Sequence, residues 1–281
     1  MTAPNLRDWI GRSEQRHDVA DLRAVHQLHT ALGRTDALPQ PGDEVPPAWH
    51  WAWFTATDPR SALDRAEMSE AGYLPPAKLP RRMWAGSRLR VHRPLRIGQA
   101  ICKQAEIADI VERQGRTGKL IFVSQRFRIY AEEALAIEEE YESVFREAAK
   151  PGAAVQQPPA APTDAAWSRQ IDPDPVMLFR FSAATFNSHR IHYDLPYATQ
   201  VEFYPGLVVH GPLTATLLME LARDCNPGRR IVAYSFRAIS ALYAPDRFTV
   251  NGKPGADGKS ARLWAANSQG GLAMQAEVAF A

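Results

Sequence analysis

Apolar residues recur at helical spacing in GPLTATLLMELARD, in the second half of the chain. Leucines follow one another at intervals of four from Leu213, and alanines and further leucines widen the stripe. Pro212 suits the first helical position, where a missing N–H costs nothing, and the NPG at 226–228 is a stop signal. The pattern predicts a mostly buried helix over about 212–224.

Strand-like runs lie on both sides of this helix. Before it, VMLFRFSAATF predicts a β-rich run over Val176–Phe186, and after it about four antiparallel strands are expected within IVAYSFRAIS, RFTVNG and ARLWAANSQGGLAMQAEVAF. SQGG separates the last two strands and is typical of a hairpin turn. An apolar helix without a polar face must be covered on most sides, so we expect a sheet curled around it.

The first half repeats the strands with a weaker helix. Four strands are predicted, within RRMWAGSRLRVHRPL, AICKQAEIADIVERQ, KLIFVSQRFRIY and LAIEEEYESVFRE. RSALDRAEMSEAG is short and polar, so a central helix there would be reduced, and Leu6–Leu32 is interpreted as a separate, mostly polar helix or helix pair. Two similar helix-plus-sheet units indicate an internal duplication.

Composition divides the chain in the middle. The stretch AAKPGAAVQQPPAAPTDAA replaces the periodic pattern with alanine, proline and glycine, which predicts a linker over 148–166. It would separate an N-terminal unit, 1–147, from a C-terminal unit, 167–281, each of ordinary single-domain size.

Charge and cysteine content narrow the function classes. The 281 residues include 33 basic and 31 acidic side chains, a net charge of +2, so nothing favours a nucleic-acid partner. No stretch reaches the roughly 18 apolar residues of a membrane span, and the charged N-terminus does not resemble a signal peptide. Cys102 and Cys225 form neither a disulfide framework nor a zinc pattern. We therefore expect a cytoplasmic protein without a membrane anchor.

Polar residues concentrate in TFNSHRIHYD, residues 185–194, just before the apolar helix, and a further histidine opens that helix in LVVHG. The stretch ends in an IH dipeptide and an aspartate, and then come a spacer with PG and an HG before the apolar helix. This order of residues resembles the signature of the MaoC-like hydratases and dehydratases. Four segments of the first half are similar to the N-terminal half of two-domain members, namely LPRRMWAG, HRPLRIGQ, GRTGKLIFV and EEEYESVFRE. The resemblance covers most of 45–281.

This resemblance implies an α+β protein with a double hot dog fold, in which two antiparallel sheets each curl around a central helix and the N-terminal helix is reduced. It also implies a cofactor-independent hydro-lyase acting on an acyl-CoA thioester, with coenzyme A as part of the substrate. The FNxHRIHYD form resembles the subgroup of type 2 hydroxyacyl-thioester dehydratases and of mesaconyl- and itaconyl-CoA hydratases. LPRRMWAG and GRTGKLIFV are most similar to bacterial hydratases of five-carbon dicarboxylic CoA esters, which implies citramalyl-CoA as the product.

One departure from the family pattern concerns the acid–base pair. Most members have DxNPxHxD where this chain has NSHRIHYD, so Asn187 replaces an aspartate, and His189 and Arg190 replace asparagine and proline. Asparagine orients water but cannot accept its proton. The acid and base work would then fall to His192, with Asn187 positioning water or the substrate carbonyl. Gly211, at the helix start, would offer its N–H to the thioester oxygen.

Other side chains of the stretch have two interpretations each. His189 contacts substrate or serves the structure, whereas His210 is expected to be structural and to cap the helix that follows it. Arg190 binds a substrate carboxylate bidentately, or it pairs with Asp194 or Glu202. Asp194 orients the catalytic histidine, or it caps a turn.

Basic residues of the first half suggest contacts with coenzyme A. Arg81 and Arg82, beside Trp84, would hold phosphates and adenine by ion pairing and stacking, or they protect a solvated strand edge. No P-loop or GxGxxG follows a strand, and no third ligand joins His189 and His192 at a metal-binding spacing. Neither a nucleotide cofactor nor a metal is expected.

Two other functions fit the same residues. A 3-hydroxyacyl-thioester dehydratase of fatty-acid metabolism, acting on carrier-protein or CoA esters, would need a long apolar tunnel with no basic residue at its end. A non-catalytic thioester-binding subunit would fit the missing aspartate. The hot dog resemblance further implies a homo-oligomer formed by sheet pairing. The reduced first helix would leave room for a branched acyl group in a pocket lined by first-half residues.

Overall fold

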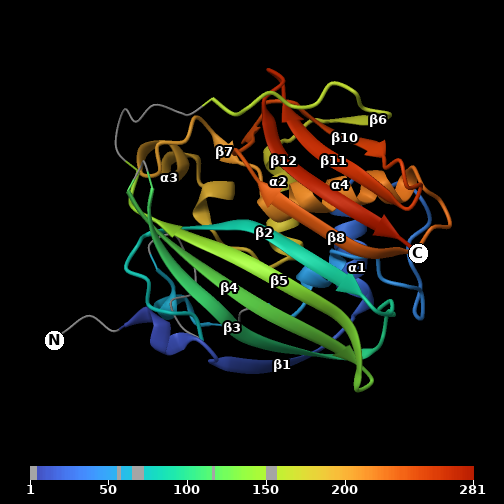
Figure 1. Cartoon of the computed structure of the whole chain (residues 1–281), viewed down its shortest axis with the longest axis horizontal. Coiled ribbons are helices and arrows are strands. Elements are labelled where there is room, and N and C mark those ends of the chain that lie inside the picture. The colour runs from blue at the N-terminus through green and yellow to red at the C-terminus, as the bar shows by residue number, and fades with distance from the viewer. Residues whose placement is uncertain (1–4, 56–57, 65–72, 116–117, 150–156) are drawn as a thin grey trace.

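One antiparallel sheet of ten strands dominates the computed structural model, which describes residues 5–55, 58–64, 73–115, 118–149 and 157–281 (Figure 1). The first half of the chain contributes β1 (Ser13–Val19), β2 (Arg81–Val91), β3 (Ala100–Gly115), β4 (Gly118–Ala131) and β5 (Ala134–Arg146). The second half contributes β6 (Trp167–Ile171), β8 (Ile231–Ala238), β10 (Phe248–Pro254), β11 (Ser260–Asn267) and β12 (Leu272–Phe280). The order is β1-β3-β4-β5-β2-β8-β12-β11-β10-β6, and β2 pairs with β8 where the halves meet.

The two halves share one topology. In each, the order across the sheet is first, third, fourth, fifth and second strand, and a helix with a buried apolar face follows the first strand and precedes the second in the chain. This helix is α1 (Leu22–Ala31) in the first half and α4 (Gly211–Asp224) in the second. The repeated order confirms the double hot dog fold, and the N-terminal helix is the reduced one, with 10 residues against 14.

Helix α4 is the buried helix that the leucine spacing predicts. Every position from Leu213 to Ala222 is buried, and the helix packs against β8, β10, β11 and β12. Tyr234 of β8 donates its hydroxyl to the carbonyl of Ala215 at 2.8 Å, which fastens the sheet to the helix. In Figure 1 the strands lie in front of this helix, so the sheet curls around it as expected.

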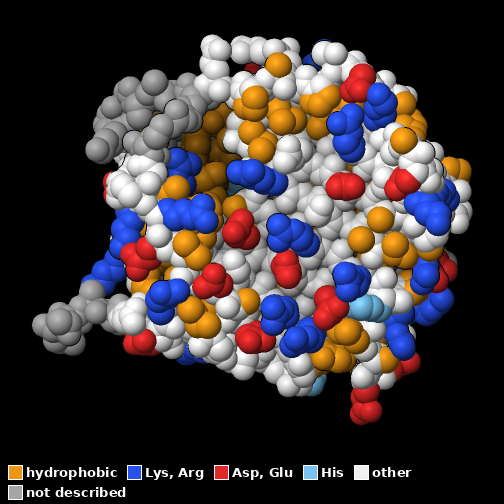
Figure 2. All heavy atoms as spheres, viewed as in Figure 1, with side chains coloured by type: hydrophobic (Ala, Val, Ile, Leu, Met, Phe, Trp, Pro, Cys, Tyr) orange, Lys and Arg blue, Asp and Glu red, His pale blue; other side chains and the backbone are white. Residues whose placement is uncertain are grey.

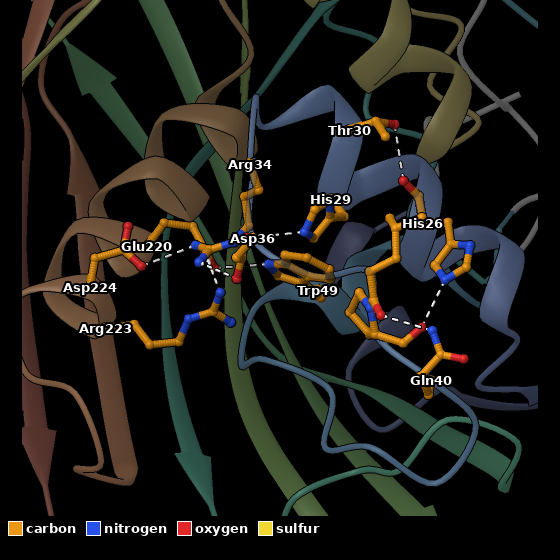
Figure 3. A network of polar contacts seen from close by, with 12 residues as sticks. His26, His29, Thr30, Arg34, Asp36, Gln40, Trp49, Glu220, Arg223 and Asp224 are labelled. Atoms are coloured by element: carbon orange, nitrogen blue, oxygen red, sulfur yellow. Dashed lines mark hydrogen bonds and ion pairs between the residues drawn. The ribbon is translucent and has the colours of Figure 1, made fainter.

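A polar network joins the loop after α1 to the buried helix (Figure 3). Glu220 of α4 accepts hydrogen bonds from Trp49 Nε1 at 3.0 Å and from Arg223 at 2.7 Å, and it also pairs with Arg34. Arg34 is further held by Asp36 at 2.8 Å. Burial raises the pKa of Glu220, and the charges of Arg223 and Arg34 oppose that rise by favouring the carboxylate.

The opening segment, expected as a helix or helix pair over Leu6–Leu32, is only partly helical. A 3-10 helix covers Leu6–Trp9 and α1 begins at Leu22, but β1 between them pairs with β3. The side chains of β1 alternate between exposed and half-buried. Its inward positions include Glu14 and Arg16, so polar residues on both faces conceal the strand period in the sequence.

The β-rich run expected over Val176–Phe186 is wrong, because this segment is helix α2 (Pro175–Ala184). Asp174 accepts a backbone N–H at 2.7 Å, and proline occupies the first turn, two local signals that start a helix. The expectation that RSALDRAEMSEAG holds the reduced central helix of the first half is also wrong, because α1 of the opening segment takes that place. In the part of RSALDRAEMSEAG that the structure describes, Arg60–Ala62 form a 3-10 helix, and residues 65–72 lie outside the described residues.

The remaining elements are short. They comprise α3 (Leu195–Gln200), two further 3-10 helices (Trp49–Ala52 and Arg190–His192) and the separate pair β7 (Leu207–Val208) and β9 (Tyr243–Ala244). Within the expected linker, residues 150–156 lie outside the described residues. Its later part packs on the C-terminal sheet, where Ala160 bridges to Gly271 and Asp164 pairs with Lys253 at 2.6 Å.

Basic and acidic side chains intersperse over the outer face of the sheet (Figure 2). Neighbouring strands pair them, as Arg88 of β2 does with Glu140 of β5 at 3.1 Å. Such exposed pairs contribute little to stability, but they keep this face in water and leave the opposite face for the core. Among the described residues, no helix has the length and apolar character to cross a membrane.

Candidate active site

A cavity of about 650 Å³ collects residues from both halves of the chain. The first half supplies Arg82, Trp84, Lys103, Glu139 and Tyr141 from the sheet, and the second half supplies Asn187, His189, His192, Gly211 and Pro212. The polar stretch at 185–194 therefore faces strands from the first half of the chain. A pocket lined by first-half residues is present, as the reduced first helix implied.

His192 ends the short 3-10 helix that follows α2, and its ring is 6% exposed. Its Nδ1 lies 2.7 Å from the carbonyl oxygen of Val208, so Nδ1 carries the proton and donates, which leaves Nε2 with its lone pair. Burial lowers the pKa of His192 from 6.5 to about 4, partly offset by the bond to Val208. The imidazole is therefore neutral and able to accept a proton near neutral pH.

His210 stacks on His192, with ring centroids 3.7 Å apart and 20° between the planes. It is the N-cap residue of α4, yet its side chain makes no capping bond, so the expected capping role is wrong. Its Nε2 instead pairs with the hydroxyl of Ser182 at 2.8 Å. Burial, followed by the charges of His192 and His189, lowers the pKa of His210 well below its usual value. The neutral His210 ring, held by Ser182, thus packs against one face of the His192 ring.

Asn187 and His189 stand beside His192 in the cavity lining. The Asn187 side-chain oxygen accepts the backbone N–H of His189 at 3.0 Å, which closes a local turn. The rings of His189 and His192 meet edge to face, with centroids 5.4 Å apart. Asn187 therefore shapes the turn with its side-chain oxygen while the residue lines the cavity.

Gly211 begins α4 at the cavity wall. First-turn N–H groups of a helix have no intrahelical acceptor, and the helix dipole favours negative charge there. A Cβ added at Gly211 would meet no protein atom within 4 Å. Packing within the protein therefore does not require glycine at this position, and the space beside the main chain there is open.

Arg190 and Asp194 form a pair of their own outside the described cavity lining. Their side chains meet at 2.7 Å, and the Arg190 guanidinium lies 4.2 Å from the ring centroid of Tyr197. Asp194 also accepts the Tyr197 N–H at 3.1 Å and so caps α3. Of the two interpretations of each residue, the geometry fits ion pairing for Arg190 and capping for Asp194.

The three first-half residues expected to hold coenzyme A separate in the structure. Arg81 pairs with Glu202 and with the Tyr204 hydroxyl, which ties β2 to the second half. Arg82 and Trp84 line the cavity. The Trp84 ring is already stacked on Tyr141, with centroids 4.5 Å apart, so that face is not open to an adenine ring.

Several residues of the site escaped sequence reasoning. The carbonyl of Val208 sets the tautomer of His192, and Ser182 holds His210, but neither residue type signals a function. Lys103 and Glu139 could have been recognised in the sequence, because each is a charged residue at an inward position of a predicted strand. The described residues contain no cluster of three metal-binding side chains.

Fold and site together define a double hot dog hydro-lyase, with a neutral histidine, an amide and a helix N-terminus around one cavity. A family model of hydroxyacyl-thioester dehydratase type 2 matches residues 48–244. The chain belongs to this family, and it is an enzyme of the hydratase and dehydratase class.

Curated relatives share sequence along most of the chain. A mesaconyl-C(4)-CoA hydratase of Chloroflexus aurantiacus is 44% identical over 261 residues, which is 92% of each chain. A mitochondrial hydroxyacyl-thioester dehydratase type 2 of Schizosaccharomyces pombe is 28% identical over 224 residues, 70% of this chain and 74% of that one. Both relatives therefore span the two halves of the sheet.

Solved structures agree on the fold. A MaoC-like dehydratase superposes with a TM-score of 0.70 at 14% identity, covering 98% of this chain and 99% of the other. A Mycobacterium tuberculosis protein with a double hotdog fold gives a TM-score of 0.61 at 12% identity, covering 97% and 96%. The architecture is thus retained where the sequence has diverged almost completely.

Proposed function

We propose that this enzyme adds water to a five-carbon dicarboxylic enoyl-CoA, with mesaconyl-C4-CoA as substrate and citramalyl-CoA as product. The Chloroflexus relative is a hydratase of mesaconyl-C(4)-CoA. The observation that carries the proposal is the cavity, which joins His192, Asn187 and Gly211 to a first-half wall containing Arg82 and Lys103. A small anionic acyl group suits such a wall.

His192 serves as base and then as acid in this proposal. Its neutral Nε2 takes a proton from water while the water oxygen bonds to Cβ, and the Gly211 N–H stabilises the negative thioester oxygen. The buried imidazolium is disfavoured, so it returns the same proton to Cα. The two hydrogens of water end on the new hydroxyl and on Cα, and no cofactor takes part.

Itaconyl-CoA is the second substrate of this proposal. Its double bond lies one position further from the thioester, so a proton must leave Cα and return at the methylene carbon before water can add. His192 would carry both transfers in turn.

The charged wall argues against a fatty-acyl substrate. Glu14, Arg16, Lys103 and Glu139 line the first-half side of the cavity, so an apolar chain would have to displace water from charged groups. Burial already lowers the pKa of Lys103. A fatty-acid dehydratase would instead favour a long apolar tunnel without a basic residue at its end.

A hydration assay across substrates tests the proposal. The loss of enoyl-thioester absorbance should give the highest kcat/KM for mesaconyl-C4-CoA, lower values for itaconyl- and crotonyl-CoA, and the lowest for a long-chain enoyl-CoA. Equal rates for mesaconyl-C4-CoA and crotonyl-CoA, or a preference for the long chain, would refute it.

The non-catalytic alternative makes an opposite prediction for the same assay. It expects binding of CoA esters without turnover, whereas the proposal expects turnover that is lost in His192→Ala. Assembly into a homo-oligomer through sheet pairing and a cytoplasmic location stay predictions, which light scattering and cell fractionation test.

A further inference from the structure

The first-half wall of the cavity holds a cation without a bound anion. Arg82 is half-buried, and among the described residues no hydrogen bond or ion pair holds its guanidinium, although Asp64 acts on it through its charge. The neighbouring Arg81, by contrast, is paired with Glu202. A charge removed from water without a partner is costly, so the Arg82 guanidinium is prepared to bind an anion.

A β-bulge directs Arg82 into the cavity. The register of β2 against β5 shifts between Trp84 and Gly86, where one extra residue enters the strand. Arg82 therefore shares its face with Ser87, whose hydroxyl bonds the buried Glu139 at 2.5 Å. Because side chains alternate along a strand, Arg82 would lie on the outer face without this extra residue.

Arg82 also lies near the histidines. The pKa of His189 is well below its usual value because of burial first, and then because of the charges of His192, Arg82 and Arg81. The His189 ring contacts His192 with centroids 5.4 Å apart. The guanidinium and both histidine rings therefore belong to the lining of one cavity.

Substrate chemistry requires a cation at this place. In mesaconyl-C4-CoA the free carboxylate is attached to Cβ, the atom to which water adds. A side chain that recognises this carboxylate must lie next to the water-activating histidine, and not at the far end of a tunnel. It would also reduce the repulsion between the carboxylate and the enolate charge that develops on the thioester.

We infer that Arg82 binds the free carboxylate of the substrate and makes the enzyme selective for the dicarboxylic ester, an inference that rests on the proposed function. The planar guanidinium matches a carboxylate with two parallel hydrogen bonds. Two other cations are committed elsewhere. Lys103 lies over the rings of Phe54 and Phe127, at 5.2 and 5.1 Å, and Arg190 is ion-paired outside the described cavity lining.

The test compares two esters of the same shape. In 3-methylcrotonyl-CoA a methyl group replaces the carboxylate of mesaconyl-C4-CoA. Arg82→Gln should lower kcat/KM for the dicarboxylic ester by about 10- to 100-fold, mainly through KM, and change that for the neutral ester by less than about twofold. Arg82→Lys should restore part of the loss. Arg88→Gln removes an exposed arginine from the same strand and should match the wild type.

The outcomes separate this inference from the proposed function. Equal hydration of both esters by the wild type would refute the proposed function itself. A wild type that prefers the dicarboxylic ester, with that preference kept in Arg82→Gln or lost instead in Lys103→Met, would show that Arg82 is not the ligand. An equal loss of kcat/KM for both esters in Arg82→Gln would also overturn the inference. Thermal unfolding of the variant would then distinguish a folding defect from weaker binding of coenzyme A.

Discussion

Acid should destabilise the folded protein through His192, and a His192→Gln variant should lose this part of the acid sensitivity. The ring is 6% exposed and its Nδ1–H is bound to the Val208 carbonyl, so the folded chain holds a neutral imidazole. Burial lowers the pKa of His192 from 6.5 to about 4. Unfolding returns the ring to water and to its ordinary pKa.

The magnitude follows from linkage between protonation and folding. Between about pH 6.5 and about pH 4, His192 is protonated in the unfolded chain but neutral in the folded chain. The free energy of unfolding therefore falls as the pH falls through this window. The full effect is about 3 kcal/mol, from about 1.36 kcal/mol for each pH unit between the two pKa values. Going from about pH 7 to about pH 5 should already cost about 2 kcal/mol.

Urea unfolding followed by tryptophan fluorescence measures this difference. The wild type should lose about 2 kcal/mol more than His192→Gln does between about pH 7 and about pH 5, since all other groups titrate in both proteins. His17→Gln removes an exposed imidazole from β1 and serves as the control, which should follow the wild type. Equal losses in the wild type and His192→Gln would refute the buried, neutral state of His192.

Activity should report the same group. The kcat/KM for hydration should stay level down to about pH 5 and fall with a midpoint near pH 4, because protonation removes the base. A pantetheine thioester is the better substrate here, since it lacks the titrating ribose phosphate of coenzyme A. A midpoint near 6.5 would show that the base is a solvated group and would contradict the assignment to His192.

Three further predictions concern single side chains. Gly211→Ala should fold normally, because the added Cβ meets no protein atom, but kcat should fall by about 10²-fold if the methyl group keeps the thioester oxygen from the main chain; the absorbance assay measures this. Asn187→Asp should raise the KM for the dicarboxylic ester by about tenfold, because it adds an anion to the cavity, with a smaller effect on crotonyl-CoA. Arg34→Ala should lower the free energy of urea unfolding by about 3 kcal/mol, because buried Glu220 then loses one of its two ion-pair partners among the described residues and keeps Arg223 alone.

Each of these predictions has an outcome that contradicts it. Normal turnover in Gly211→Ala would remove the main-chain donor from the mechanism. Equal KM changes for both esters in Asn187→Asp would place that residue away from the substrate carboxylate. Arg96→Ala breaks an exposed ion pair with Glu44, and a loss of stability equal to that of Arg34→Ala would show that the buried network contributes no more than a surface pair.

Local patterns in the sequence determined the central helix and most strands. The leucine spacing from Leu213 and the proline at its start predict α4, because a helix depends on residues within a turn or two of each other. The same holds for the strands, as the alternating burial along most of β4 shows. The family signature around His192 and Gly211 was also readable, since its residues lie close together in the chain.

Tertiary structure decided which side chains meet. Arg81, Arg82 and Arg190 are chemically alike in the sequence, but a register shift in β2 turns Arg82 toward the histidines, while Glu202 and Asp194 hold the other two. The pairing of β2 with β8 joins the two halves, and Arg82 of the first half then lines one cavity with His189 and His192 of the second. Spacing along the chain encodes helices and strands because those depend on near neighbours. The charge environment of a site depends on strand register and burial, which only the folded chain fixes.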